Sequence, residues 1–261
     1  MITLLTVIFF VFGLTIGSFL NVVILRLNTG KSFKGRSACM SCRNQLRFYE
    51  LVPVLSFLGL GGRCRNCKTK ISIQYPLVEL ATGIIFATFF LKFQDIFFFD
   101  TSSFIFSYAY YVMMFSLLLI IAVYDLKHKI ISDVLVFVLG AFSFLGLFFF
   151  SSFGFYPHIP SILQFLSGFL IAAPFALLWL VSSGRWMGFG DAKLAIGLGW
   201  LLGFSLALSG VMIAFWIGAL LGLSLIIFTK KYGLKSEIPF APYLILGMFL
   251  AFIFELHLFG I

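Results

Sequence analysis

The chain has 261 residues, of which 62% are hydrophobic and 10% charged, and its net charge is +9. Soluble domains carry about 25% charged residues, so this composition excludes an ordinary soluble protein and predicts that lipid surrounds most of the chain. Ten of the 18 Lys and Arg residues lie between Arg26 and Lys70, where Glu50 is the one acid. Beside a membrane helix, such a loop indicates a cytoplasmic membrane surface more than a nucleic-acid site.

Apolar segments follow one another along the chain, and a bilayer core needs about 20 apolar residues per helix. Eight candidates fit: 2–25, 77–93, 103–124, 131–150, 161–182, 192–206, 208–229 and 239–259. The first has no basic segment before it and no small-residue cleavage site, so we expect a retained helix. The sequence therefore predicts an all-α polytopic membrane protein with about eight transmembrane helices.

The distribution of basic residues predicts the orientation of these helices. With the N-terminus outside, the inside segments are all basic: 26–76, 125–130, 183–191 and 230–238. The outside loops 94–102 and 151–160 contain no Lys or Arg. Because cytoplasmic loops are enriched in Lys and Arg, this orientation is favoured, and it places Asp125 and Asp191 at the cytoplasmic boundary.

The same segments suggest three parts. Residues 1–25 form the first helix, 26–76 a cytoplasmic loop domain, and 77–261 the main membrane domain. Glycines four residues apart should allow helices to approach closely. The pairs are Gly13/Gly17, Gly199/Gly203 and Gly218/Gly222.

All four cysteines lie in the 26–76 loop, as two C-x-x-C pairs with 21 residues between them. The pairs are Cys39/Cys42 and Cys64/Cys67. Two such pairs at this spacing indicate a structural Zn²⁺ site, since four thiolates leave no open coordination position. Two disulfides are the alternative, which the reducing cytoplasm disfavours, and a redox site would need only one pair.

Two aspartates at helix ends stand out among the few acids. Asp125 follows a long apolar segment, and Asp191 follows Gly188-Phe189-Gly190. An ionisable residue at a membrane span suggests function, although each aspartate alone could simply pair with Lys127 or Lys193. Together, two carboxyl groups sharing one proton supply the base and the acid that peptide hydrolysis needs. The two glycines would let an extended substrate approach the backbone.

Several motifs resemble one family of enzymes. Tyr124-Asp125 with Gly188-Phe189-Gly190-Asp191 is similar to the GxGD intramembrane aspartyl proteases, which include presenilins and prepilin peptidases. The stretch from Asp125 to Asp133 resembles the D-L-x-x-x-x-I-P-D pattern of bacterial type IV prepilin peptidases, with Ser132 replacing proline, and we expect Asp133 to cap the next helix. Further similar motifs run in order from about residue 13 to 247: Gly17–Val23, Phe48–Glu50, Pro53–Ser56, Gly62–Arg65, Gln74–Glu79 and Pro239–Tyr243.

The resemblance implies an activity that the residues alone do not reveal. Such enzymes cleave the basic leader from type IV prepilins and type II secretion pseudopilins after a Gly, at the bacterial inner membrane. Members with the cysteine loop also N-methylate the new N-terminal residue, usually Phe, using S-adenosylmethionine. By resemblance Gly62 is tied to methylation, and Glu79 is a candidate site residue or a structural acid. Tyr124 and Lys193 are candidate supporting residues.

Partners and alternatives follow from the same observations. We expect prepilin and pseudopilin substrates and membrane lipids as partners, and no nucleic acid. A protease without methylation is one alternative. A proton-coupled transporter is another, but it predicts acids near mid-bilayer and inverted repeats. A membrane scaffold with a zinc loop would leave the aspartate pair unexplained.

Overall fold

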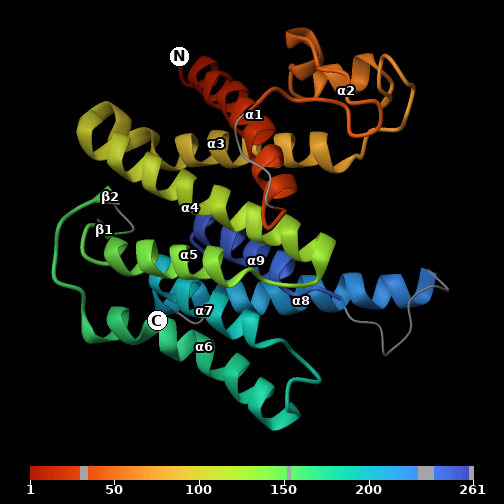
Figure 1. Ribbon diagram of the computed structural model, residues 1–261. Coiled ribbons are helices and arrows are strands. Elements are labelled where there is room, and N and C mark those ends of the chain that lie inside the picture. The colour runs from red at the N-terminus through yellow and green to blue at the C-terminus, as the bar shows by residue number, and fades with distance from the viewer. Residues whose placement is uncertain (30–34, 152–153, 229–237, 259–261) are drawn as a thin grey trace. The chain divides into compact units, whose positions relative to one another are not determined.

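The computed structural model describes residues 1–29, 35–151, 154–228 and 238–258 (Figure 1). The expected basic segment 230–238, with Lys230, Lys231 and Lys235, lies outside the described residues except for Ile238. By its internal contacts the chain divides into two compact units, Met1–Gln94 and Asp95–Ile261. The expected division at residues 25 and 76 stays a prediction.

The first unit contains two long helices and a loop with short helical turns. They are α1 (Ile2–Arg26), the 3₁₀ turn η1 (Phe48–Leu51), α2 (Leu55–Gly59) and α3 (Gln74–Phe99), which continues into the second unit. Glycines allow α1 to contact α3 backbone to backbone, as expected. A Cβ atom on Gly13 would lie 2.8 Å from the Cα of Gly83, and one on Gly17 would lie 2.7 Å from the Cα of Glu79.

The second unit holds the remaining elements in chain order (Figure 1). They are α4 (Thr101–His128), α5 (Asp133–Gly146), β1 (Phe150–Ser151), β2 (Gly154–Phe155), α6 (Ile162–Ser182), α7 (Phe189–Leu202), α8 (Phe204–Phe228) and α9 (Ala241–Ile253). Helix α7 contacts α5, α6, α8 and α9, so it forms the centre of this unit. Leu194, Ala195 and Leu198 on α7 are fully buried. The antiparallel pair β1–β2 was not expected from the sequence.

Each of the eight apolar segments forms a helix, so the prediction of an all-α membrane protein is confirmed apart from the small hairpin. Within the described part of the chain, five helices are long and apolar enough to cross a membrane, namely α1, α3, α4, α6 and α8. Helix α8 has a mean hydropathy of 2.6 over a stretch that is only 6% buried, which is the arrangement expected of a helix facing lipid. Helices α5, α7 and α9 have 14, 14 and 13 residues and are shorter than a perpendicular span needs.

The glycine pairs of the second unit differ from expectation in part. A Cβ on Gly199 would lie 2.7 Å from the Cα of Gly168, so α6 and α7 do approach closely there. Gly203 instead has φ +77° and open space around it, because it ends α7 in a conformation that favours glycine. Near Gly218 the closest atom to an added Cβ would be 3.7 Å away, an ordinary contact.

Candidate functional site

Asp125 and Asp191 occupy neighbouring positions at two helix ends in the second unit. Asp125 lies one turn before the end of α4, where Lys129 adopts the left-handed conformation and its N–H donates to the Asp125 carbonyl at 2.7 Å. Asp191 lies in the first turn of α7. Their exposed fractions are 4% and 8%, and the two carboxyl groups are close enough to interact electrostatically. The structure therefore brings together the two acids that the sequence singled out.

Each aspartate has one buried carboxyl oxygen without a hydrogen-bond partner among the described residues. These atoms are Oδ2 of Asp125 and Oδ1 of Asp191. Buried polar atoms in native proteins nearly always have a partner, often ordered water, so such exceptions need an explanation. A pair of carboxyl groups with available oxygens can share a proton, hold a water molecule and contact a polar substrate group.

The start of α9 supplies a partner for Asp125 that the sequence did not identify. The backbone N–H of Ala241, the first residue of α9, donates to the Asp125 carboxyl group. The side chain of Ala241 is fully buried. The positive end of the α9 dipole thus faces an acid, which stabilises its negative charge. Pro242 was the signal in the sequence that could have indicated this contact. Proline in the first turn marks the start of a helix, and the N–H groups there have no partners within the helix.

The two glycines before Asp191 have different surroundings. A Cβ on Gly190 would lie 3.0 Å from the Cβ of Ile131, so Gly190 allows the start of α7 to contact the segment between α4 and α5. Gly188 is the N-cap of α7, with extended backbone. The nearest atom to a Cβ on Gly188 would be the Oδ2 of Asp191, at 3.9 Å. The open backbone beside the acid is therefore at Gly188.

Lys193 pairs with Asp133 and not with Asp191. Its Nζ donates to the Asp133 carboxylate at 2.8 Å, and it also lies 5.4 Å from the centre of the Phe189 ring. The expectation that Asp133 caps α5 is wrong, because Ser132 occupies the N-cap position and Asp133 is the first helical residue. The structure thus places no Lys193 ion pair on Asp191.

Tyr124 is buried beside Asp125 and contacts the end of α4. Its ring lies 4.3 Å from the ring of His128, and its carbonyl is 3.2 Å from His128 Nδ1. Tyr124 therefore orders the last turn of α4, which follows Asp125.

The four cysteines gather in the first unit, and their Sγ atoms all lie within 4.8 Å of one another. Cys39 Sγ and Cys67 Sγ are 3.8 Å apart. Four sulfurs at about 2.3 Å from a tetrahedral Zn²⁺ would be about 3.8 Å apart. All four cysteines are free thiols, so the disulfide alternative is not the arrangement found.

The two cysteine pairs repeat one backbone pattern. In the first, the Cys39 N–H donates to the Asn44 carbonyl and the Arg43 N–H to the Cys39 carbonyl, both at 2.9 Å. In the second, the Cys64 N–H donates to the Thr69 carbonyl at 2.9 Å and the Lys68 N–H to the Cys64 carbonyl at 3.0 Å. The residue after each second cysteine has positive φ, +58° at Arg43 and +60° at Lys68. Two equivalent turns therefore direct four thiols to one point.

The protonation of Cys67 also suits a metal ligand. Hydrogen bonds with the side chain and backbone of Thr69 lower the pKa of the Cys67 thiol to about 6. The thiolate, not the thiol, is the form that binds a metal ion. The donor set and its spacing thus fit a tetrahedral metal ion.

Gly62 and Glu79 both lie against the segment from Val54 to Phe57. Gly62 has φ +64°, and a Cβ there would lie 3.0 Å from the Phe57 ring of α2. Buried Glu79 on α3 accepts a hydrogen bond from the Val54 N–H at 2.8 Å and another from the side chain of Ser18 on α1. Glu79 therefore links α1, α3 and the start of α2, and its role at the site stays a prediction.

Comparison with known proteins agrees with this arrangement. Residues 11–93 match the bacterial peptidase A24 N-terminal domain, and residues 112–253 match the type IV leader peptidase family. The chain therefore belongs to the type IV leader peptidase family. The family resemblance read from the motifs is thereby confirmed, and the apolar helices together with the family identify a multi-pass inner-membrane protein.

Curated relatives named prepilin leader peptidase/N-methyltransferase are similar to this chain over most of their length, as three of them show. The Myxococcus xanthus protein is 33% identical over 236 residues, which cover 90% of this chain and 67% of that protein. The Bacillus subtilis protein is 31% identical over 253 residues, covering 95% and 93%. The Pseudomonas aeruginosa protein is 30% identical over 265 residues, covering 92% and 87%. No solved structure matches the chain.

Proposed function

We propose that this chain removes the basic leader peptide from type IV prepilins and type II secretion pseudopilins and then N-methylates the new N-terminal residue. The relatives' name joins these two activities. The observation that carries the proposal is the pair of buried, adjacent carboxyl groups of Asp125 and Asp191, each with an available oxygen. Their place at helix ends favours a protease over a transporter, which needs acids near mid-bilayer.

The arrangement supports hydrolysis by a shared-proton pair. Two adjacent carboxyl groups in a buried site hold one proton between them, because two negative charges at close range are unfavourable. The ionised member takes a proton from water, which attacks the scissile carbonyl. The protonated member donates to the carbonyl oxygen, and a proton then passes to the amine leaving group. The Ala241 N–H on Asp125 distinguishes the two acids and favours Asp125 as the ionised member.

The place of the reaction follows from the distribution of basic residues. The loop 26–76 carries ten Lys and Arg residues and one acid. The positive-inside rule then puts this loop and both aspartates at the cytoplasmic boundary and the N-terminus in the periplasm. Prepilin leaders are short and basic, so this orientation keeps the leader in the cytoplasm.

We further propose that Cys39, Cys42, Cys64 and Cys67 bind one structural Zn²⁺. The two equivalent backbone turns and the short distances between the Sγ atoms support the assignment of zinc, since tetrahedral sites of four thiolates are typical of zinc. S-adenosylmethionine supplies the electrophilic methyl group for the second activity.

Incubation of purified protein with a prepilin and labelled S-adenosylmethionine tests both activities, with mass analysis of the product's N-terminus. We expect a leaderless product with one added methyl group. A leaderless product without methylation would support the alternative of a protease alone, and an uncleaved prepilin would contradict the proposal.

Substitution of Gly62 by Val is expected to reduce methylation on the order of tenfold and to leave cleavage within about twofold. A side chain at φ +64° is strained and would displace the Phe57 ring, which disturbs α2. The measurement is the methylated fraction of pre-cleaved pilin beside the rate of leader removal.

Gly140→Val is the matched control, because a Cβ on Gly140 has no neighbour within 4 Å and its φ is negative. It should leave both activities near the level of the unaltered protein. A Gly62→Val protein that loses cleavage before methylation would contradict the assignment of methylation to the loop.

A further inference from the structure

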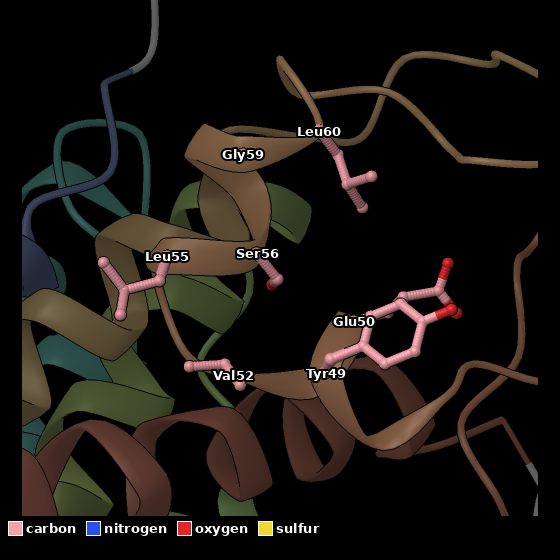
Figure 2. A pocket seen from close by; sticks show the side chains of 7 residues that line it. All are labelled: Tyr49, Glu50, Val52, Leu55, Ser56, Gly59 and Leu60. Carbon is pink, nitrogen blue, oxygen red and sulfur yellow. The ribbon is translucent and has the colours of Figure 1, made fainter.

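The cysteine loop contains a hollow that the proteolytic reaction does not use. It has a volume of about 370 Å³ and lies between η1 and α2 (Figure 2). Its lining residues are Tyr49, Glu50, Val52, Leu55, Ser56, Gly59 and Leu60. Figure 2 shows Leu60 and Ser56 on one side of the hollow and the Tyr49 ring and Glu50 carboxylate on the other. Pockets for small molecules have volumes of about 300–1,000 Å³, with apolar walls and a few polar groups, as here.

The two side chains that give the hollow its polarity are held in place. Glu50 Oε2 accepts a hydrogen bond from the Arg47 N–H at 2.7 Å, which closes a capping box around η1. The Tyr49 hydroxyl accepts from Arg47 Nη1 at 3.1 Å and also from the guanidinium of Arg65. Arg65 lies over the Tyr49 ring, 5.4 Å from its centre. The carboxylate and the ring are thus positioned before any ligand arrives, which lowers the entropic cost of binding.

The one ionisable acid of this basic loop is among the residues that line the hollow. Ten Lys and Arg residues and a single acid lie between residues 26 and 76, and that acid, Glu50, lines the hollow. A carboxylate beside an aromatic ring favours a cation, because both the charge and the ring quadrupole attract it.

We infer that this hollow binds S-adenosylmethionine, with Glu50 and Tyr49 selecting its positively charged sulfonium group. The inference rests on the proposed function, since it locates the methyl donor of the second activity. Apolar contacts to Leu55 and Leu60 suit the uncharged parts of the ligand. Methyl transfer breaks the bond between methyl carbon and sulfur and leaves the electron pair on sulfur. The amine gains the methyl group and loses a proton to solvent. The product, S-adenosylhomocysteine, has no sulfonium charge, so the same two residues favour its release.

Hydrogen bonds connect the lining of the hollow to the segment that carries the second cysteine pair. The Gly62 N–H donates to the Phe57 carbonyl of α2 at 2.9 Å, and the Ile71 N–H donates to the Gly62 carbonyl at 2.8 Å. Arg65, between Cys64 and Cys67, contacts Tyr49. Gly62 and the second cysteine pair therefore support the lining of the hollow from outside it. This support would account for the expected effect of Gly62 on methylation without contact between Gly62 and the methyl donor.

Binding of labelled S-adenosylmethionine and S-adenosylhomocysteine to full-length protein in detergent, measured by equilibrium dialysis, tests the inference. Glu50→Gln keeps an oxygen for the capping box but removes the charge. We expect about tenfold weaker binding of S-adenosylmethionine and a change of less than about twofold for S-adenosylhomocysteine, as a lost charge–charge contact predicts. Tyr49→Leu should act in the same direction by removing the ring.

A pair of neighbouring substitutions on α2 tests the position independently of charge. Gly59→Phe adds a ring to the lining, and a Cβ there meets nothing within 4 Å, so the backbone can accept it. It should weaken both ligands at least about tenfold. Leu58→Phe is the matched control, because Leu58 is exposed on the same helix and does not line the hollow. Unchanged metal content shows that the cysteine loop of each variant is folded, and unchanged prepilin cleavage shows that the unit with the two aspartates is intact.

Three results would overturn the inference or its premise, and they are distinguishable. Unaltered S-adenosylmethionine binding by both Glu50→Gln and Gly59→Phe, in a protein that methylates pilin, would place the methyl donor elsewhere. A Glu50→Gln protein with unaltered methyl-donor binding but a raised KM for cleaved pilin would assign the hollow to the pilin amine. A wild-type protein that neither binds S-adenosylmethionine nor methylates would refute the proposed methyl transfer itself.

Discussion

Asp125→Asn and Asp191→Asn are each expected to reduce leader removal by at least about a thousandfold, since general acid–base catalysis by a positioned pair is lost. Asn keeps the size and one hydrogen-bonding oxygen of the buried side chain, so the helix ends should stay in place. It can neither take a proton from water nor hold the shared proton. The double variant should be little worse than either single one, because the two acids act as a unit. The measurement is the rate of cleavage of a prepilin in detergent or membranes.

The controls separate proton sharing from charge and folding. Asp95→Asn removes an exposed acid at the far end of α3 and should retain full activity. Glu at either catalytic position keeps the charge but moves it by one methylene, which positioned proton transfer tolerates poorly. Methylation of a pre-cleaved pilin should survive all of these changes. Substantial cleavage by either Asn variant would mean that Asp125 and Asp191 do not form the proposed pair.

The helices and the cysteine cluster could be predicted because neighbouring residues in the sequence determine them. The aspartate pair could be predicted from the order of the membrane segments. Apolar length predicts the eight helices, because the bilayer fixes how many apolar residues a span needs. The C-x-x-C spacing predicts the cysteine cluster, since each pair forms its own turn. The prediction that Asp125 and Asp191 meet came from alternating membrane crossings, which are expected to bring one end of α4 and the start of α7 to the same side.

The features that the sequence did not predict depend on which side chains meet across elements. Lys193 could reach either Asp191 or Asp133, and only the packing of α7 on α5 decides for Asp133. The sequence suggested that the backbone at Gly190 is open to a substrate. In the structure the space beside Gly190 is filled by Ile131. The hydrogen bond from the Ala241 N–H to Asp125 could not be predicted, because every residue except proline has such an N–H group and the sequence does not show where it points. The Tyr49 side chain at the hollow is likewise contacted by Arg65, which lies 16 residues away in sequence.

Loss of the metal is expected to unfold the cysteine loop and to abolish methylation while cleavage persists. Among the described residues 35–73, Cys64 alone is buried, so the loop has no hydrophobic core to hold its shape. Structural zinc in small domains contributes on the order of 10 kcal/mol, and a loop without a core depends on it. The change is Cys64→Ser, which removes one of four ligands from the cluster. Metal analysis, limited proteolysis of the loop and the methylation assay measure the result, and the metal should fall from one Zn²⁺ per chain to almost none.

The matched control for this substitution is Ser41→Ala, which changes a residue inside the first cysteine pair without removing a ligand and should keep the metal. Cleavage should persist when methylation is lost, because Asp125, Asp191 and Ala241 all belong to the other compact unit of the chain. The pairing of Arg65 with Tyr49 gives a second readout, since a metal-free loop no longer fixes the Tyr49 ring at the hollow. Binding of S-adenosylmethionine should therefore disappear together with the metal. A Cys64→Ser protein that still methylates at the normal rate would show that the cluster neither shapes the methylation site nor needs its fourth thiolate.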